Sequence, residues 1–396
     1  MKRLLLLGGS AQQVVAIKTA KKMGIYTILC DYLPDNPGQF YADKYYLEST
    51  TNKEKILNIA RDEAIDGIVA YASDPAAPTA AYVAEKLKLP TNSYESVCIL
   101  CNKDKFREFL KFNGFNTPLS KTYTDSSVID KECELDFPVI VKPVDSSGSK
   151  GVSIVSDTEN LKNAIEFSLS YSRTGKCIVE QYIQNKYKYI IGGDVFVVDG
   201  KIEIWGLLNC HRDKEVNSLV PVGKSFPLCI SHDDEVRVKR CLQSLVDKLN
   251  IMQGAMNVEL IVDKCNRVWP IDIGPRNGGN MIPNLLGYIY GIDVVKMTLE
   301  VAMGQTVNYH LGDGNLYYAT HNLHSKRNGK LDDIIFSDVL KDKIIQKCIY
   351  KKKGDEVEYF DNASKALGII FMKFSTNEEM MQILDNINDY ITIKLF

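Results

Sequence analysis

The chain has 396 residues, of which 45% are hydrophobic and 25% are charged, and its formal net charge is −2. This composition is that of a globular protein with room for about two to four domains. No basic run stands out beyond Lys351 to Lys353, so the sequence gives no reason to expect a nucleic-acid partner. No window approaches the roughly 18 apolar residues of a membrane span. Ten cysteines without a repeated spacing favour reduced thiols, and we expect a cytoplasmic protein.

Strand and helix signals alternate in the first part of the chain and predict a βαβ series with a parallel sheet. Strands are expected at about 4–7, 26–31 and 66–71, and helices at about 11–23, 53–61 and 76–87. The turn Gly8-Gly9-Ser10 and the later Asp31 imitate a dinucleotide fingerprint. The full G-x-G-x-x-G is absent, however, and NAD binding is disfavoured.

The remainder of the chain mixes antiparallel strands with helices. Helices are expected at about 93–112, 157–171, 233–248, 293–302 and 378–387, and strands at about 137–143, 151–155, 177–183, 194–208, 256–262, 268–273, 317–321 and 366–373. The strand pair 194–208 should turn at Asp199-Gly200, which is a typical hairpin turn. No linker rich in proline or serine separates the parts, so continuous packing of the domains is expected.

Two carboxylates, Glu259 and Asp272, flank a short turn in MNVELIVDKCNRVWPIDIGPRNGG. On a strand that alternates faces, Val258 and Leu260 point away from Glu259, and the same alternation applies around Asp272. The two carboxylates should therefore be cross-strand neighbours, where like charges repel unless a cation lies between them. A divalent metal is the natural candidate, because Mg2+ is typically held by one or two carboxylates together with substrate phosphates.

The alternative is an exposed hairpin whose charges simply face water, and for an isolated pair of carboxylates that alternative would be preferred. The residues that follow favour the metal site. The loop Gly274 to Asn280 contains a cation, Arg276, and several glycines. Flexible backbone amides beside a cation suit an anionic oxygen better than ordinary turn closure.

A second polar loop, Ser146 to Gly151, follows a strand that ends at Lys142 and Pro143. Its small residues let backbone N–H groups approach phosphate oxygens, while Lys142 and Lys150 add positive charge. Loops of serine and glycine are common in hairpins, and the order G-x-x-x-x-G-K-[ST] of a P-loop is missing. If the loop does bind phosphates, we expect it to order over them as a lid.

The segment Glu180-Gln181-Tyr182-Ile183 ends a hydrophobic strand, where a carboxylate and backbone groups could meet an adenine edge. For these four residues alone, a surface strand end is the favoured interpretation. Lys103, Lys142, the small-residue loop, this segment and the carboxylate hairpin, in this order, resemble the ATP-grasp superfamily over essentially the whole chain. Within it the sequence is most similar to the carboxylate-amine ligases, which are related to biotin carboxylase, carbamoyl-phosphate synthase and phosphoribosylglycinamide synthetase.

The resemblance implies an α/β protein whose core is α+β. It would have an N-terminal Rossmann-like pre-ATP-grasp domain (1–95), an ATP-grasp core of two α+β subdomains (96–305, lid about 117–182) and a small mixed C-terminal α/β domain (306–396). It also implies ATP and Mg2+ or Mn2+ as cofactors, small-molecule substrates and no nucleic-acid or membrane partner, and it leaves a homodimer open.

The resemblance assigns roles to individual residues. Glu180 would take the adenine amino group, Ile183 would offer its backbone to the ring, Glu259 and Asp272 would hold the metal, and Arg276 would stabilise the transferring phosphoryl group. The implied nucleotide-binding set is Lys103, Lys142, Ser146, Ser147, Gly148, Ser149, Lys150, Gly151, Glu180, Gln181 and Ile183, with Lys142 and Arg276 as the catalytic cations.

The sequence departs from the superfamily pattern in two places. Gly274 stands where an asparagine metal ligand is common, so one or two metal ions remain open and Asn277 or Asn280 would be the substitute. A carboxylate that often binds ribose, seven residues beyond Glu180, is replaced by Tyr187. Ribose recognition should therefore differ.

The implied reaction uses ATP to phosphorylate a carboxylate, and an amine then attacks the acyl phosphate to form a C–N bond, releasing ADP and phosphate. Candidate substrate contacts, for each of which a structural role is an equal alternative, are Asn209, His211, Arg212, Lys224, Asn277 and Asn280. The alternatives are an enzyme like phosphoribosylglycinamide synthetase, a carboxyphosphate-forming enzyme, and a non-catalytic ATP-binding module. The motifs name neither the acid nor the amine.

Overall fold

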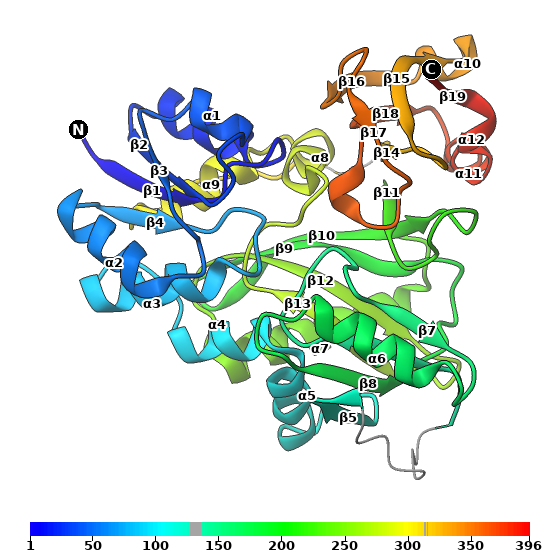
Figure 1. Ribbon diagram of the computed structural model, residues 1–396, viewed down its shortest axis with the longest axis horizontal. Coiled ribbons are helices and arrows are strands. Elements are labelled where there is room, and N and C mark those ends of the chain that lie inside the picture. Colours follow the sequence, from blue (N-terminus) through cyan, green and yellow to red (C-terminus); the bar gives the residue numbers. More distant parts are fainter. Residues whose placement is uncertain (127–135, 313, 315) are drawn as a thin grey trace.

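The structure is a computed structural model that describes residues 1–126, 136–312, 314 and 316–396. Within that part, the strands form four sheets, and helices pack on their faces (Figure 1). The mixed α/β class that the sequence predicts is confirmed. The N-terminal sheet and the last strands of the chain lie on two sides of a central antiparallel core (Figure 1).

The N-terminal sheet is parallel, with the order β3-β2-β1-β4. Its strands and the helices around it are β1 (Arg3–Leu7), β2 (Tyr26–Asp31), β3 (Lys44–Leu47), β4 (Gly67–Val69), α1 (Val14–Lys22), η1 (Pro37–Phe40), α2 (Lys53–Asp62) and α3 (Ala77–Leu87). Leu4 to Leu7 are all buried because β1 is central and covered on both faces. The predicted βαβ series is therefore confirmed.

The central sheet has eight strands in the order β13-β12-β9-β10-β11-β14-β18-β16, and each neighbouring pair is antiparallel. Its strands are β9 (Ile190–Val198), β10 (Lys201–Arg212), β11 (Pro221–Phe226), β12 (Gly254–Val262), β13 (Val268–Gly274), β14 (Tyr317–Leu323), β16 (Ile344–Ile349) and β18 (Gly368–Phe374). β9 and β10 form the hairpin expected at Asp199-Gly200. Because β11 pairs with β14, the sheet continues across residue 305, and the division of domains there remains a prediction.

Helices cover the two faces of the central sheet. The long helix α7 (His232–Leu249) buries Leu242, Leu245 and Val246 against one face, together with strand residues such as Val258. On the other face, α8 (Ile282–Tyr290) and α9 (Val294–Ala302) pack against residues that include Phe196. Strand residues alternate between these two cores as the two-residue period requires.

A smaller antiparallel sheet has the order β5-β8-β6-β7. Its elements are β5 (Ser120–Tyr123), β6 (Val139–Pro143), β7 (Ser153–Val155), α6 (Leu161–Ser170) and β8 (Cys177–Gln181). The last part of the chain adds β15 (Gly329–Phe336), α10 (Asp338–Lys341), β17 (Glu356–Val357), η3 (Ala363–Lys365), α11 (Asn377–Asp385), α12 (Ile387–Tyr390) and β19 (Ile391–Leu395). β6 and β7 flank the small-residue loop, as the sequence predicts.

The single helix expected over 93–112 is wrong. The segment forms two helices, α4 (Tyr94–Cys101) and α5 (Lys103–Phe112), with Asn102 in an extended conformation between them at φ −127° and ψ 113°. The Asn102 side chain donates to the Cys98 carbonyl at 2.8 Å, and the Lys103 backbone N–H donates to the Val144 carbonyl at 2.9 Å. The break therefore places Lys103 at the start of α5, beside the smaller sheet.

No helix among the described residues is long and apolar enough to cross a membrane. The nine cysteines in the described part of the chain are free thiols, as the spacing predicts. Cys133 lies outside the described residues.

We predict that Gly193→Ala strongly destabilises the protein. Gly193 has φ +135°, and an added Cβ would lie 2.0 Å from the Gly206 carbonyl oxygen on the neighbouring strand. Strain and overpacking together should lower the free energy of unfolding by about 3 kcal/mol or more. Urea unfolding would measure this loss. In Gly175→Ala, φ is also positive at +67° but nothing lies within 4 Å, and the loss should be far smaller; equal losses would contradict the argument.

Candidate active site

A cavity of about 760 Å3 lies between the smaller sheet and the central sheet, and the C-terminal segment borders it. Many of the residues that the sequence singles out line it together. They are Lys103, Lys142, Ser146, Ser147, Gly148, Ser149, Lys150, Glu180, Gln181, Ile183, His211, Arg212, Glu259 and Asp272. Tertiary folding thus collects these segments around one space.

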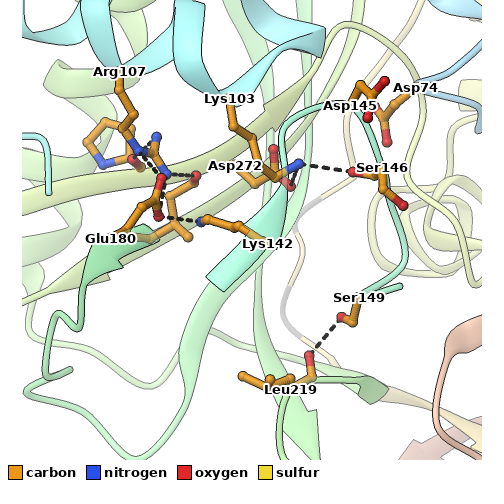
Figure 2. Close-up of polar contacts among 12 residues, drawn as sticks. Asp74, Lys103, Arg107, Lys142, Asp145, Ser146, Ser149, Glu180, Leu219 and Asp272 are labelled. Atoms are coloured by element: carbon orange, nitrogen blue, oxygen red, sulfur yellow. Dashed lines mark hydrogen bonds and ion pairs between the residues drawn. The ribbon is translucent and has the colours of Figure 1, made fainter. Parts of the chain in front are cut away.

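Lys103 reaches from the first residue of α5 into this cavity (Figure 2). Its Nζ lies 3.5 Å from Asp272 Oδ2 and donates to the Ser146 carbonyl at 3.0 Å. The same ammonium group therefore links a carboxylate of the central sheet to the small-residue loop. A cation placed between them can also meet the anionic oxygens of a ligand.

Glu180 lies on β8 between two cations (Figure 2). Its carboxylate oxygen Oε1 lies 2.8 Å from Arg107 Nε, and Oε2 lies 2.5 Å from Lys142 Nζ. The Glu180 side chain is only 2% exposed. Burial opposes its ionisation, but Arg107 and Lys142 outweigh that effect and hold the pKa of Glu180 below its ordinary value. Burial lowers the pKa of Lys142, against the attraction of Glu180.

Glu259 and Asp272 pair across β12 and β13, so the cross-strand arrangement predicted from the sequence is confirmed. Each carboxylate has a cationic neighbour: Glu259 forms an ion pair with Arg212, and Asp272 faces Lys103. The Asp272 side chain is 43% exposed to the cavity. The protein around it disfavours the charge, but Lys103 and then Lys142 prevail and lower the pKa of Asp272. Glu259 and Asp272 both line the cavity, where a cation or a cationic ligand can replace Arg212 and Lys103 as their partners.

An apolar slot adjoins these charges. Ile183, Ile190, Ile261 and Ile271 pack together and also line the cavity. The slot lies next to the end of β8, where Gln181 and Ile183 bring backbone groups to the same wall. A flat, apolar ring with polar edges matches such a slot.

The small-residue loop closes another side of the cavity. Ser149 Oγ donates to the Leu219 carbonyl at 2.9 Å (Figure 2), which ties the loop to the segment before β11. Gly151 does not line the cavity. Its φ is +72°, and a Cβ there would lie 2.8 Å from both Pro143 and Tyr171, so its place is at the base of the loop. Whether the loop orders over a ligand remains a prediction.

The other substrate candidates divide into two groups. His211 and Arg212 line the cavity. Asn209 is buried and donates to the Pro227 carbonyl at 2.8 Å, and Lys224 donates to Cys210 Sγ at 2.9 Å. Asn280 is bound through its backbone N–H to Gln12 Oε1 at 2.5 Å. These last three do not line the cavity, and their contacts are those of structural residues.

Arg276 and Asn277 line a second cavity of about 500 Å3 beside the N-terminal sheet. The Arg276 guanidinium binds Asp74 through Nε at 2.7 Å and through Nη2, and Nη1 donates to the Asn277 carbonyl at 2.9 Å. The Asn277 amide is buried, and within the described structure neither of its polar atoms has a hydrogen-bond partner. Neither residue faces the carboxylate pair through the main cavity in this arrangement.

Sequence reasoning missed two residues that organise the site. Arg107 lies four positions after Lys103, one turn along α5. That i, i+4 spacing places the two cations on the same face of the helix, and it was the available signal for Arg107. Asp74, which pairs with Arg276, follows β4 in the N-terminal part and carries no such signal.

The donors around Glu259 and Asp272 fit a hard divalent cation, because both are carboxylates on one face of the hairpin. Among the described residues, no group of three or more His, Cys, Asp or Glu side chains is arranged to hold a metal ion. A metal at this pair would therefore need further oxygens from a ligand, and phosphate oxygens are the usual source for Mg2+.

Comparison with known proteins agrees with this geometry. Residues 135–284 match the family model described as an ATP-grasp domain. The crystal structure of phosphoribosylglycinamide synthetase from Anaerococcus prevotii superposes with a TM-score of 0.78 and 25% identity, covering 100% of both chains. Residues 135–284 therefore form an ATP-grasp domain. The structure of an L-amino acid ligase from Bacillus licheniformis has the same fold, with a TM-score of 0.83, 19% identity and coverage of 100% of this chain and 99% of that one.

Among curated proteins, the carbamoyl phosphate synthase large chain of Pseudothermotoga lettingae is 26% identical over 302 residues, or 74% of this chain. The chain spans only 26% of that relative's length. These similarities support the carboxylate-amine ligase branch that the motifs indicate.

We predict that His211 makes the protein less stable in acid. Burial lowers the pKa of His211 to about 4, from an ordinary value of 6.5. The folded state therefore takes up this proton less readily than the unfolded state, and its stability falls as the pH drops from 6.5 towards 4. Between pH 7.5 and pH 5 this effect should amount to about 2 kcal/mol.

In His211→Gln, the difference between the free energies of unfolding at pH 7.5 and pH 5 should be smaller by that amount, as urea titrations at both pH values would show. His310 is exposed, and His310→Gln serves as the matched control that should keep the wild-type difference. An unchanged difference in His211→Gln would contradict the assignment.

Proposed function

We propose that this protein is an ATP-dependent ligase that activates a carboxylate as an acyl phosphate and joins it to an amine, with release of ADP and phosphate. One observation carries the proposal: a single cavity combines the cations Lys103 and Lys142, the carboxylates Glu259 and Asp272, and an apolar slot. The slot suits an adenine ring, the cations suit phosphates, and the carboxylates suit the metal that accompanies them.

The nucleotide would lie with its base in the isoleucine slot and its phosphates towards Lys103 and the small-residue loop. Lys142 approaches the same space from β6 and is held by Glu180. Glu180 is committed to Arg107 and Lys142, so we propose that its main role is to position these cations, and that contact with the adenine amino group uses its remaining lone pairs.

Glu259 and Asp272 would hold Mg2+ or Mn2+, which would neutralise charge on the transferred phosphoryl group. Arg212 and Lys103, their neighbours in this structure, would then be free to meet the phosphates or the acid. The protein thus keeps each carboxylate paired before a ligand arrives. That arrangement limits the repulsion between the two carboxylates across the hairpin.

The reaction would proceed in two transfers. A carboxylate oxygen of the acid attacks the terminal phosphorus of ATP, forming an O–P bond as the bond to the ADP oxygen breaks. The amine nitrogen then attacks the carbonyl carbon, the bond to phosphate breaks, and the amine loses a proton. Phosphate is a far better leaving group than an oxide ion, so no covalent enzyme nucleophile is required.

Arg276, expected from the sequence to stabilise the transferring phosphoryl group, lines the second cavity and not the main one. Two donors of its guanidinium bind Asp74 and one binds the Asn277 carbonyl, which leaves two of its five N–H groups. The Asp74 pair holds the guanidinium beside the end of β13. Arg276 would act on a substrate that extends beyond Asp272 towards the N-terminal sheet.

We predict that Glu259→Gln and Asp272→Asn each lower ADP formation by about a hundredfold or more, because an amide is a poor substitute for a charged ligand of Mg2+. Electron paramagnetic resonance of Mn2+ should show weakened binding of the metal in the presence of a non-hydrolysable ATP analogue. Circular dichroism should remain that of the wild type. Asp233 is an exposed carboxylate on α7, and Asp233→Asn should change neither measurement; normal turnover in the double variant would exclude the metal assignment.

We also predict that oxygen-18 placed in the acid appears in the released phosphate, one atom per turnover, whichever amine completes the reaction. A screen of amino acids and small carboxylates in pairs, read by ADP release and by mass detection of the product, would first find a reactive pair. Mass spectrometry of the phosphate then follows the label.

Two results would count against the ligase. Unlabelled phosphate from a labelled acid that is consumed would exclude an acyl phosphate intermediate. ATP binding without ADP formation on any pair would favour the non-catalytic module instead.

A further inference from the structure

The wall of the main cavity next to the isoleucine slot is formed by Tyr187, Lys188 and Tyr189. The hydroxyl of Tyr187 is used at the start of α7, where it donates to Asp234 Oδ2 at 2.6 Å and lies 3.1 Å from Ser231 Oγ. Tyr187 therefore serves the packing of α7. The polar groups that this segment offers to the cavity come from the next two residues.

Lys188 and Tyr189 both bind Asp385, the last residue of α11. Lys188 Nζ donates to Asp385 Oδ2 at 2.6 Å, and the Tyr189 hydroxyl donates to Asp385 Oδ1 at 2.7 Å. Asp385 also lines the cavity, and its side chain is 35% exposed. The C-terminal part of the chain thus places a carboxylate in the wall of a cavity that the central sheet and the smaller sheet form.

The position of Asp385 relative to the slot follows from the chain. Lys188 and Tyr189 directly precede Ile190, whose side chain packs with Ile183 and Ile261 in the slot. Asp385 binds both of these residues and lines the same cavity as the slot, and on this basis we place it at the rim of the slot. A group attached to a ring in the slot would pass this rim.

The Asp385 carboxylate is suited to accept hydrogen bonds from two neighbouring hydroxyls. Burial raises its pKa, but the hydrogen bonds from Lys188 and Tyr189 outweigh this and lower it, so the group is ionised at neutral pH. Each carboxylate oxygen has two acceptor sites, and one on each is taken by Lys188 or Tyr189. One acceptor site on each oxygen remains free for a ligand. The contacts with Lys188 and Tyr189 fix the orientation of the carboxylate.

We propose that Asp385 binds the ribose hydroxyls of the nucleotide, so that the C-terminal segment supplies the carboxylate for sugar recognition. A vicinal diol is the group that matches two fixed acceptors, and carboxylates recognise ribose hydroxyls in other nucleotide sites. The inference rests on the proposed function, because it takes ATP as the ligand of the cavity. It makes Asp385 a residue that distinguishes ribonucleotides from deoxyribonucleotides.

Isothermal titration calorimetry of the full chain with ATP, 2′-deoxyATP and 3′-deoxyATP, each with Mg2+, tests the proposal. The wild type should bind ATP more tightly than either deoxynucleotide by on the order of tenfold, the effect of a hydrogen bond to a charged group. In Asp385→Ala, the three affinities should become equal to within about twofold, because ATP loses two hydrogen bonds to the carboxylate and each deoxynucleotide loses the one that it makes in the wild type.

Asp389→Ala is the matched control, since Asp389 lies on the adjacent α12, is exposed and does not line the cavity. It should keep the wild-type preference for ATP. Tyr189→Phe removes one of the two contacts that orient Asp385 and should reduce the preference in part. Lys188 is 64% exposed, so it can be solvated when Asp385 is removed, and the variant should fold.

Three results would overturn the assignment of Asp385. The first is a full preference for ATP in Asp385→Ala, and the second is an equal loss of affinity for all three nucleotides, which would indicate a structural role. The third is an unchanged preference together with a raised KM for the amine, which would make Asp385 a contact of the amine. A wild type that binds none of the nucleotides would instead remove the proposed function, and this inference with it.

Discussion

The ion pairs of Glu180 are the interaction on which the arrangement of the site depends. A carboxylate with 2% exposure is stable in ionised form only if cations compensate the loss of water. Arg107 from α5 and Lys142 from β6 provide that compensation. Because the three groups come from three elements, the pairs fix α5 against the smaller sheet. Lys103 begins the same helix, so its reach into the cavity is fixed as well.

The continuity of the central sheet is the second constraint. β10 carries His211 and Arg212 into the cavity region, β11 pairs with β10, and β14 adds directly to β11. The helices α11 and α12, which follow the last strand of that sheet in sequence, reach the same cavity through Leu384 and Asn388. The C-terminal part of this chain therefore shapes the site and is not an appendage to it.

The charges of the site are balanced locally before any ligand is bound. Glu259 lies against Arg212 and Asp272 lies against Lys103, so neither carboxylate is left to repel the other across the hairpin. In the proposed reaction a metal ion and a polyphosphate enter with opposite charges, and the partners can be exchanged without leaving an uncompensated group. Exchange of this kind requires little movement, because Lys103 already contacts the loop that would cover the phosphates.

Much of the local structure followed from the sequence. The two-residue alternation around Glu259 and Asp272 placed both carboxylates on one face of a hairpin, and the structure shows them as cross-strand partners. The parallel N-terminal sheet and the β6–β7 hairpin around the small-residue loop were also predicted. These features depend on patterns a few residues long, which local periodicity records.

The helix expected over 93–112 shows the limit of such patterns. Asn102 interrupts it because the Lys103 N–H bonds to the carbonyl of Val144, the residue directly after β6, and a window of helix-forming residues contains no information about that partner. Tertiary contact therefore overrode a local preference.

The sequence by itself determined many of the strands and helices and which two carboxylates face each other across the hairpin, because those properties repeat every 2 or 3.6 residues. Only the tertiary structure decided that Arg107 meets Glu180, that Asp74 holds Arg276 and that Asp385 meets Lys188. Each of these pairs joins residues far apart in the chain. Their meeting depends on how complete elements pack, and the charge of each partner alone is compatible with many other neighbours.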